Sequence, residues 1–154
     1  MIGTRLRIAT AADSDPLGVV MFRAIHEGDS PYTKAQRTAW LPRPNSGADW
    51  AARLLGQHVL LAQADEITGF MSVSQEGYVD LAYILPEARG QGLFAQLLEQ
   101  IEAEARGQGA KQLTTHASLM AQPAFQRCGF VIDYQETVAR NGQTLARARM
   151  CKNL

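Results

Sequence analysis

The sequence predicts an α+β fold with a mixed, mostly antiparallel central sheet, helices on its flanks and one parallel crossover. Three observations support this prediction. Strand-like apolar runs at residues 59–64, 68–74 and 78–85 follow one another with breaks short enough for hairpins. A helical apolar stripe at residues 93–105 comes next, and a further strand pattern follows it at 111–117. This order favours parallel neighbours joined by a right-handed crossover.

The segments before this sheet pattern predict one strand and three helical pieces. Alternation at residues 6–8 indicates a first strand. The run Asp13-Ser14-Asp15-Pro16 is typical of a helix start, because its oxygens can cap the first amides and proline fits the first turn. A short helix is expected at Thr33–Trp40, then a loop at Leu41–Ala48 and a helical piece at Asp49–Leu55.

The segments after the crossover predict a further short helix and a closing hairpin. The helix is expected at Pro123–Cys128. Strands at Phe130–Val138 and Thr144–Cys151 flank Asn141-Gly142, a dipeptide typical of tight two-residue hairpins. No internal repeat or low-complexity tract interrupts this order, so residues 1–154 are expected to form a single domain.

Composition narrows the class of protein. Apolar residues make up 46% of the chain and charged residues 19%, which is typical of a globular domain. Lysine plus arginine equals aspartate plus glutamate at 15 each, so no basic field favours a nucleic acid or a membrane as partner. Neither a signal peptide nor a membrane span is expected. Cys128 and Cys151 make no disulfide framework, and a cytoplasmic location is expected.

The stretch Pro86–Phe94 carries most of the functional information. Two glycines lie where a strand passes into a helix, so the first helical amides lack internal partners and the positive end of the helix dipole points outward. Such a terminus suits a phosphorylated ligand. Residues 90–95 also fit the dinucleotide fingerprint, but the strand at 111–117 lacks the acid this fold requires. A helix start that binds no ligand is the remaining alternative.

Two blocks of sequence resemble the general N-acetyltransferase (GNAT) superfamily. Arg89–Phe94 resembles the Q/R-x-x-G-x-G/A motif that grips the pyrophosphate of acetyl-CoA in that family. Tyr83–Pro86 resembles the strand and proline before the motif, and Ser118–Phe130 resembles the family's second block, which closes in Gly-Phe. The resemblance covers nearly the whole chain, is most specific over residues 79–130, and is nearest to the small single-domain bacterial type.

The resemblance implies a set of cofactor contacts, with acetyl-CoA as co-substrate and no metal. The backbone of one strand would bind the pantetheine arm as an added strand, and the glycine loop would bind the pyrophosphate. Ser118 replaces a frequent asparagine of the second block, and Phe125 replaces a frequent catalytic tyrosine. The complete expected set is Ala82, Tyr83, Ile84, Arg89, Gly90, Gln91, Gly92, Leu93, Phe94, Ala95, Ser118 and Phe125.

Acetyl transfer to an amine needs a group that removes a proton from the ammonium form. Asp80 is the predicted base, because on a strand it shares an apolar face with Tyr78 and burial there would raise its pKa. The alternative is that Asp80 only accepts structural hydrogen bonds. Tyr78 is expected beside it as a second catalytic or substrate contact. For the acid, Tyr134 and His116 are alternatives to a thiolate that leaves unassisted.

Substrate contacts are expected from the front half of the chain, at Glu27, Tyr32 and Trp40, with core packing as the alternative for the two aromatic residues. The resemblance implies an N-acetyltransferase acting on a primary amine of a small molecule or a protein. A non-catalytic acyl-CoA sensor on the same fold is the alternative. A homodimer joined through end strands is a further expectation.

Overall fold

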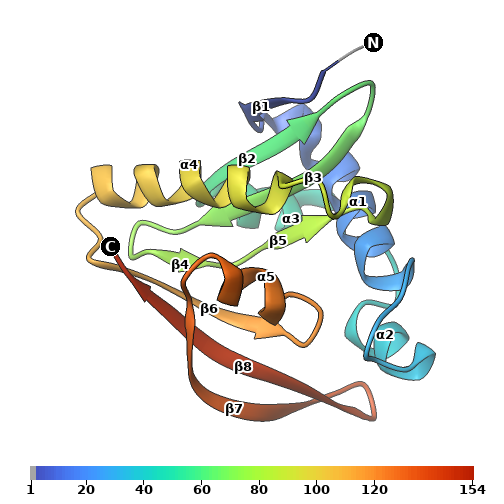
Figure 1. Ribbon diagram of the computed structural model, residues 1–154. Helices are drawn as coiled ribbons and strands as arrows, with labels where there is room; N and C mark the ends of the chain where they lie inside the picture. Colours follow the sequence, from blue (N-terminus) through green and yellow to red (C-terminus); the bar gives the residue numbers. More distant parts are fainter. Residues whose placement is uncertain (1–2) are drawn as a thin grey trace.

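The computed structural model describes residues 3–154, which form two four-stranded sheets covered by five α-helices (Figure 1). The elements follow in this order: β1 (Arg5–Ile8), a 3-10 turn (Ala11–Asp13), α1 (Ser14–His26), α2 (Lys34–Trp40), α3 (Gly47–Leu55), β2 (His58–Gln63), β3 (Ile67–Val73), β4 (Tyr78–Val79), β5 (Ala82–Ile84), a 3-10 turn (Pro86–Ala88), α4 (Leu93–Gly107), β6 (Gln112–Ser118), α5 (Gln122–Arg127), β7 (Val131–Arg140) and β8 (Gln143–Asn153).

The first sheet has the order β1-β2-β3-β5 and is antiparallel throughout. The second sheet has the order β4-β6-β8-β7, and its β4–β6 pair is parallel. The mixed, mostly antiparallel architecture with one parallel pair confirms the predicted fold class.

The single strand predicted at residues 78–85 is wrong in one respect, because two short strands in different sheets occupy this segment. Tyr78 and Val79 pair with β6, and residues 82–84 pair with β3. Leu81 lies where the chain stops pairing with β6 and begins to pair with β3. Its carbonyl accepts from the Ser72 amide at 2.9 Å, and its own amide donates to Ser72 Oγ at 3.1 Å. The alternating apolar pattern does not reveal this change, because both strands keep a buried side.

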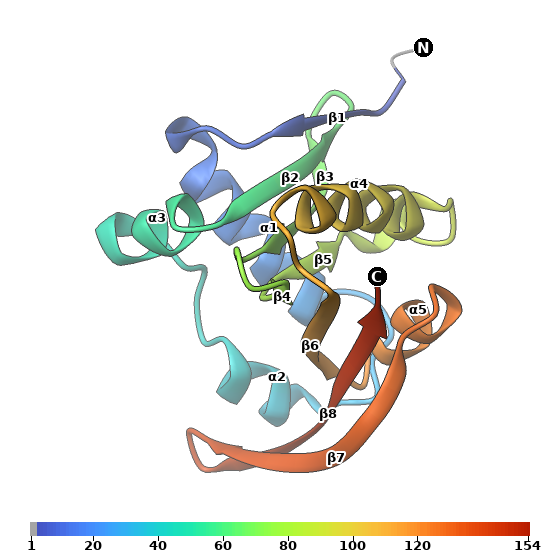
Figure 2. The ribbon, with the colours of Figure 1, turned by 90° about the vertical axis from the view of Figure 1, so that its left-hand side faces the viewer.

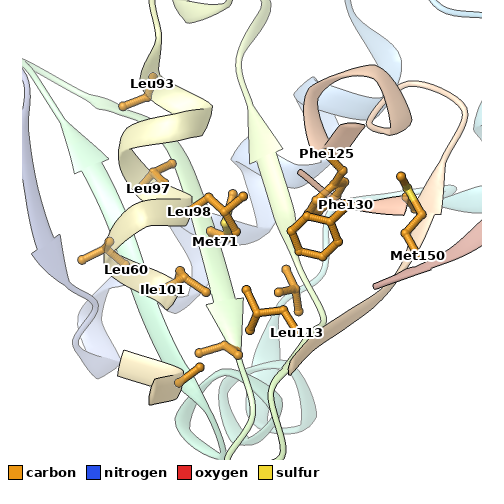
Figure 3. Packing of buried hydrophobic residues seen from close by; sticks show 14 of the residues in the cluster. Leu60, Met71, Leu93, Leu97, Leu98, Ile101, Leu113, Phe125, Phe130 and Met150 are labelled. Atoms are coloured by element: carbon orange, nitrogen blue, oxygen red, sulfur yellow. The ribbon is translucent and has the colours of Figure 1, made fainter. Parts of the chain in front are cut away.

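The first sheet is buried on both faces, which explains its nearly continuous apolar strands. Leu60 and Met71 face α4, where Leu97, Leu98 and Ile101 form the apolar stripe predicted from the sequence (Figure 3). The opposite face packs against α1 through a second cluster: Leu17, Ile25, Leu61, Phe70 and Leu81. Each such large apolar side chain contributes roughly 1.5–3 kcal/mol when fully buried. The two helices therefore hold β5 in a fixed position between them.

The turn end of the β7–β8 hairpin extends beyond the pairing with β6 and lies beside α2 (Figure 2). Its turn is formed by Asn141 and Gly142 at φ of +48° and +81°, as the tight two-residue turn predicted from the sequence requires. Asn141 Nδ2 donates to the carbonyl of Ala39 at 2.8 Å, and Gln36 Nε2 donates to that of Thr144 at 2.9 Å. These contacts join the second sheet to the helical front half.

The two sheets separate after β4. The parallel pairing of β4 with β6 ends at Val79 and Thr115, and β5 then pairs only with β3 while β6 continues along β8. Figure 1 shows β5 and β6 diverging from this point, with the start of α4 and the helix α5 beside the opening. Among residues 3–154, no helix combines the length and the apolar character that a membrane span requires.

Candidate functional site

A cavity of about 830 Å³ opens where β5 and β6 diverge. Its walls are the end of α1, the strand β5, the start of α4, and the β6–α5 connection with α5 itself. This volume suits a ligand of cofactor size. Most of the cofactor contacts predicted from the sequence line it: Ala82, Tyr83, Ile84, Arg89, Gly90, Gly92, Leu93, Phe94, Ala95 and Ser118.

The glycine loop presents a row of backbone donors to this cavity. Gly90 and Gly92 have φ of +74° and +80°, which favours glycine at both positions. Within the described chain, the amides of residues 90–95 donate to no protein acceptor, and Gln96 is the first to donate back, to the carbonyl of Gly92 at 3.1 Å. An added Cβ at either glycine would meet no protein atom within 4 Å. The loop therefore has the open space, the donors and the helix dipole that an anionic group needs.

Arg89 fixes this loop to its surroundings and adds positive charge to the cavity wall. Its Nε donates to the carbonyl of Ile84 at 3.0 Å, and Nη2 donates to that of Ala24 at 2.9 Å. Burial lowers the pKa of Arg89, but an arginine stays protonated at neutral pH. The side chain thus links β5 to the end of α1 and keeps its charge at the cavity.

The backbone of β5 has one side without a partner. Leu81 and Leu85 bond to β3, so their neighbours at alternate positions, Ala82 and Ile84, direct their amides and carbonyls away from β3. The Ile84 carbonyl accepts from Arg89, while the amides of Ala82 and Ile84 donate to no group in residues 3–154. The predicted backbone contact of Tyr83 is wrong, because the same alternation turns its backbone toward β3. Only its side chain reaches the cavity.

Asp80 does not have the environment predicted for a base. It lies in the break between β4 and β5, does not line the cavity, and accepts two hydrogen bonds from Arg53 at 2.9 Å each and one from Gln57 at 3.0 Å. Burial raises the pKa of Asp80, but these hydrogen bonds outweigh burial and hold the pKa below its usual range. The expected raised pKa is therefore wrong. The carboxylate instead joins α3 to the strand break.

Tyr78 lies beside His116, a pairing that the sequence did not reveal. The Tyr78 hydroxyl is 2.8 Å from His116 Nδ1. His116 shares a face of β6 with Ser118, which lines the cavity. Burial, with the charge of the neighbouring Arg147, lowers the pKa of His116, so its imidazole is mostly neutral at pH 7. A neutral imidazole can accept a proton.

The three predicted substrate contacts have different surroundings. Trp40 lines the cavity. Tyr32 is only 5% exposed and does not line it, and its hydroxyl donates to the carbonyl of Ala146 and accepts from the amide of Leu119. Glu27 pairs with Arg23 at 2.9 Å on the surface outside the cavity. Trp40 therefore stays a predicted substrate contact, whereas the Tyr32 hydroxyl is used in backbone hydrogen bonds and Glu27 in a surface ion pair.

Phe125 and Gln91 do not reach the cavity with their side chains, so their predicted cofactor contacts need correction. Phe125 is 1% exposed, and its ring lies between those of Phe94 and Phe130 at centroid distances of 5.0 and 4.9 Å (Figure 3 labels Phe125 and Phe130). Phe94 covers it and lines the cavity itself. The Gln91 side chain donates to the carbonyl of Glu87 at 3.2 Å, which leaves only its backbone amide for a ligand.

The cavity also has lining residues that the sequence did not single out. They come from the end of α1, the segment after it, and the β6–α5 connection: Ala24, Ile25, Asp29, Pro31, Leu119 and Met120. Leu119 and Met120 lie within the second block that resembles the family, but no cofactor contact was predicted for them. The other four carry no motif and reach the cavity because α1 and the segment after it pack beside β5. In the part of the chain that the structure describes, no group of three or more histidine, cysteine or acidic side chains could hold a metal ion.

Comparison with known proteins agrees with this geometry. A family profile described as "Acetyltransferase (GNAT) domain" matches residues 29–151. The chain belongs to the GNAT acetyltransferase family. It is accordingly an acetyltransferase, and the matched region contains the glycine loop, β5 and the β6–α5 connection.

Individual relatives agree with the family assignment. YafP of Escherichia coli, an uncharacterized N-acetyltransferase, is 29% identical over 145 residues, which cover 92% of this chain and 91% of the relative. A crystal structure from Rhodopseudomonas palustris, described as a GCN5-related N-acetyltransferase and a class-II aminotransferase, has a TM-score of 0.91 at 29% identity and covers 100% of this chain and 98% of its own. A phosphinothricin acetyltransferase of Sinorhizobium meliloti in complex with acetyl-CoA shares the fold, with a TM-score of 0.74 at 22% identity over 98% of this chain and 88% of that one.

Proposed function

We propose that the cavity binds acetyl-CoA and that the protein transfers its acetyl group to a primary amine. One observation carries this proposal: the unpartnered amides of residues 90–95 and the unpartnered edge of β5 border the same cavity. The amides at the start of α4 suit a pyrophosphate. The β5 edge suits an extended arm with amide groups, which can pair with it as a further strand.

We infer the direction of the ligand from the two ends of this cavity. With the pyrophosphate at residues 90–95, the arm runs along β5 from Ile84 toward Ala82. The thioester then lies near the point where β5 and β6 diverge. The Ala82 amide, which has no acceptor within residues 3–154, is placed to donate to the oxyanion that forms when the amine attacks.

The reaction also needs a proton acceptor, because an alkyl ammonium with a pKa of about 10.4 cannot attack a thioester. His116 and Tyr78 are the candidates after the correction at Asp80. Neither lines the cavity, but His116 lies two residues before Ser118 on β6, which does, so we place the pair at the cavity edge. Their hydrogen bond of 2.8 Å allows a proton to pass from the amine through the Tyr78 hydroxyl to the imidazole. The pair is only partly buried, so the imidazole can return the proton to water.

The acceptor is proposed to be a primary amine of a small molecule or of a protein. The free thiols Cys128 and Cys151 fit a reducing compartment, and we propose a cytoplasmic location on that ground. A non-catalytic acyl-CoA sensor is the second candidate, and the buried Phe125 in place of the frequent tyrosine favours it.

A panel of amines with acetyl-CoA, read by release of the CoA thiol, tests the proposal. Polyamines, amino acids, aminoglycosides and peptide N-termini each represent one acceptor class. Turnover on any class supports acetyl transfer, with the product mass increased by one acetyl group. Tight binding of acetyl-CoA without turnover on any class would favour the sensor, and binding of NAD in its place would favour the dinucleotide alternative.

A further inference from the structure

We propose that the hydroxyl of Tyr83 is the hydrogen-bond donor that stabilises the departing CoA thiolate. This inference rests on the proposed function and adds a catalytic residue to it. The family's frequent tyrosine position holds Phe125, which has no proton to give and does not reach the cavity. The proposal assigns the task to β5 instead of α5.

Within residues 3–154, Tyr83 is the one tyrosine that lines the cavity. The sequence contains four tyrosines. The Tyr32 hydroxyl is used by a backbone amide and a backbone carbonyl, and the Tyr78 hydroxyl is used by His116. Tyr134 lies on β7, is 46% exposed and does not line the cavity. In the described range 3–154, the Tyr83 hydroxyl has no hydrogen-bond partner.

The backbone of β5 fixes where this hydroxyl points. Ala82 and Ile84 pack on the side of α4, so the Tyr83 side chain between them stands on the opposite face of the sheet, toward α1. Its ring lies 6.4 Å from that of Trp40 and 5.9 Å from that of Phe70. These contacts hold the ring against the wall of the cavity. Both Tyr83 and Trp40 line the cavity.

A mostly buried tyrosine normally finds a hydrogen-bond partner within the protein, because an unpaired buried hydroxyl costs free energy. The absence of one at Tyr83 indicates that a ligand atom is its partner. Burial raises the pKa of Tyr83, with Arg53 and Asp80 as nearby opposing charges, so the hydroxyl stays protonated at neutral pH and acts as a donor. Tyr83 lies between the two β5 residues whose backbones face the arm, close to the thioester end.

The proton balance of the step is complete without a further reactant. The amine nitrogen forms a bond to the acetyl carbon, the carbon–sulfur bond breaks, and its electron pair stays on sulfur. The Tyr83 hydroxyl donates a hydrogen bond to that sulfur. The thiolate then takes up from water a proton equivalent to the one that the amine nitrogen has lost, and this gives the CoA thiol. Since a thiol with a pKa of about 8.5 is a good leaving group, the donor accelerates the step without being indispensable.

The test compares wild type with Tyr83→Phe, which removes only the hydroxyl and keeps the packed ring. Tyr134→Phe is the control, because it makes the same chemical change outside the cavity. Two quantities are measured: turnover with acetyl-CoA on the best amine, and the pKa of the thiol of bound CoA. The second is read by the ultraviolet absorbance of the thiolate against a complex with desulfo-CoA, and it needs no acceptor.

We expect Tyr83→Phe to bind acetyl-CoA as wild type does, to lose about 10²-fold in turnover, and to raise the pKa of the bound CoA thiol by about one unit. Tyr134→Phe should match wild type in both. If Tyr83→Phe also matches wild type in both, the inference is overturned while acetyl transfer stands. If no protein in the series binds acetyl-CoA, the proposed function falls as well. A melting temperature equal to that of wild type confirms that the variant is folded.

Discussion

The substitution Gly92→Asp should abolish tight binding of acetyl-CoA while leaving the protein folded. Gly92 caps the start of α4 at φ of +80°, and an added Cβ there would point into open space next to the unpartnered amides. The aspartate side chain would therefore occupy the position of a phosphate. It would also place a negative charge beside a ligand group that carries negative charge itself.

The electrostatic part of the loss in affinity can be estimated from Coulomb's law. Two unit charges 4 Å apart repel by about 1 kcal/mol in water and by about 4 kcal/mol at an effective dielectric constant of 20. A cavity open to solvent lies between these limits, so the charge alone raises the dissociation constant by about 5-fold to 10³-fold. The positive φ adds a cost of about 1–2 kcal/mol, but this cost acts on stability and not on binding.

Calorimetry with acetyl-CoA, with matched control variants, separates the effect of the negative charge from the effect of the added side-chain volume. Gly109→Asp carries the same charge change at a similar φ of +87°, also without a nearby protein atom, but at the far end of the 15-residue α4. It should bind acetyl-CoA as wild type does. Gly92→Asn has the shape without the charge and should show an intermediate loss. Equal affinity of wild type and Gly92→Asp, with both folded, would refute the assignment of the loop.

Substitutions at three further positions test other parts of the account. Asp80→Asn should lower turnover less than about tenfold and lower the free energy of unfolding by about 1 kcal/mol, because Asp80 forms a partly exposed ion pair with Arg53. A loss of 10²-fold or more in turnover, with the fold unchanged, would restore Asp80 as the base. Hydrogen bonds from Arg7 lower the pKa of Asp13 from 3.8 to about 2, so the pair stabilises the fold above pH 4 and this contribution disappears as the pH falls from 4 to 2. Asp13→Asn should therefore lower the free energy of unfolding, measured with denaturant, by about 2 kcal/mol at neutral pH, and the difference from wild type should vanish near pH 2. A difference that stays constant with pH would exclude the ion pair as its cause. Phe125→Ala should cost about 3–5 kcal/mol, because the ring is fully buried, while Phe125→Tyr should change turnover little; a hundredfold gain would show that a missing acid limits the reaction.

The order of elements was predictable because each depends on local patterns. The apolar stripe of α4, the Asn141-Gly142 turn and the glycine loop all have signals within a few residues, and all three are present. The change of sheet at Leu81 had no such signal. It depends on Ser72, nine residues away, which bonds the Leu81 backbone on two sides. Pairing partners are set by the whole fold, so a strand pattern alone cannot show where one sheet ends and the next begins.

In the site too, features with a local sequence signal were predictable, and features that depend on contacts between distant segments were not. The loop amides were predictable because glycine spacing before a helix determines where they point. The environment of Asp80 was not, because Arg53 and Gln57 belong to α3 and its C-terminal connection and approach only in the folded protein. Tyr83 shows the same limit. Its motif position indicated a backbone contact, but the pairing register of β5 with β3 turns its backbone away and leaves the side chain in the cavity.

A titration of the ¹⁵N-labelled protein with acetyl-CoA, followed by amide resonances, tests the central claim most directly. We predict that the largest shifts fall on the amides of residues 90–95, with further shifts at Ala82 and Ile84, because these donors have no acceptor in the described chain and gain one from the ligand. The amides of β1 and of the β7–β8 turn should not move. Saturable shifts that leave residues 90–95 unchanged, or no shifts at all at millimolar acetyl-CoA, would contradict the account.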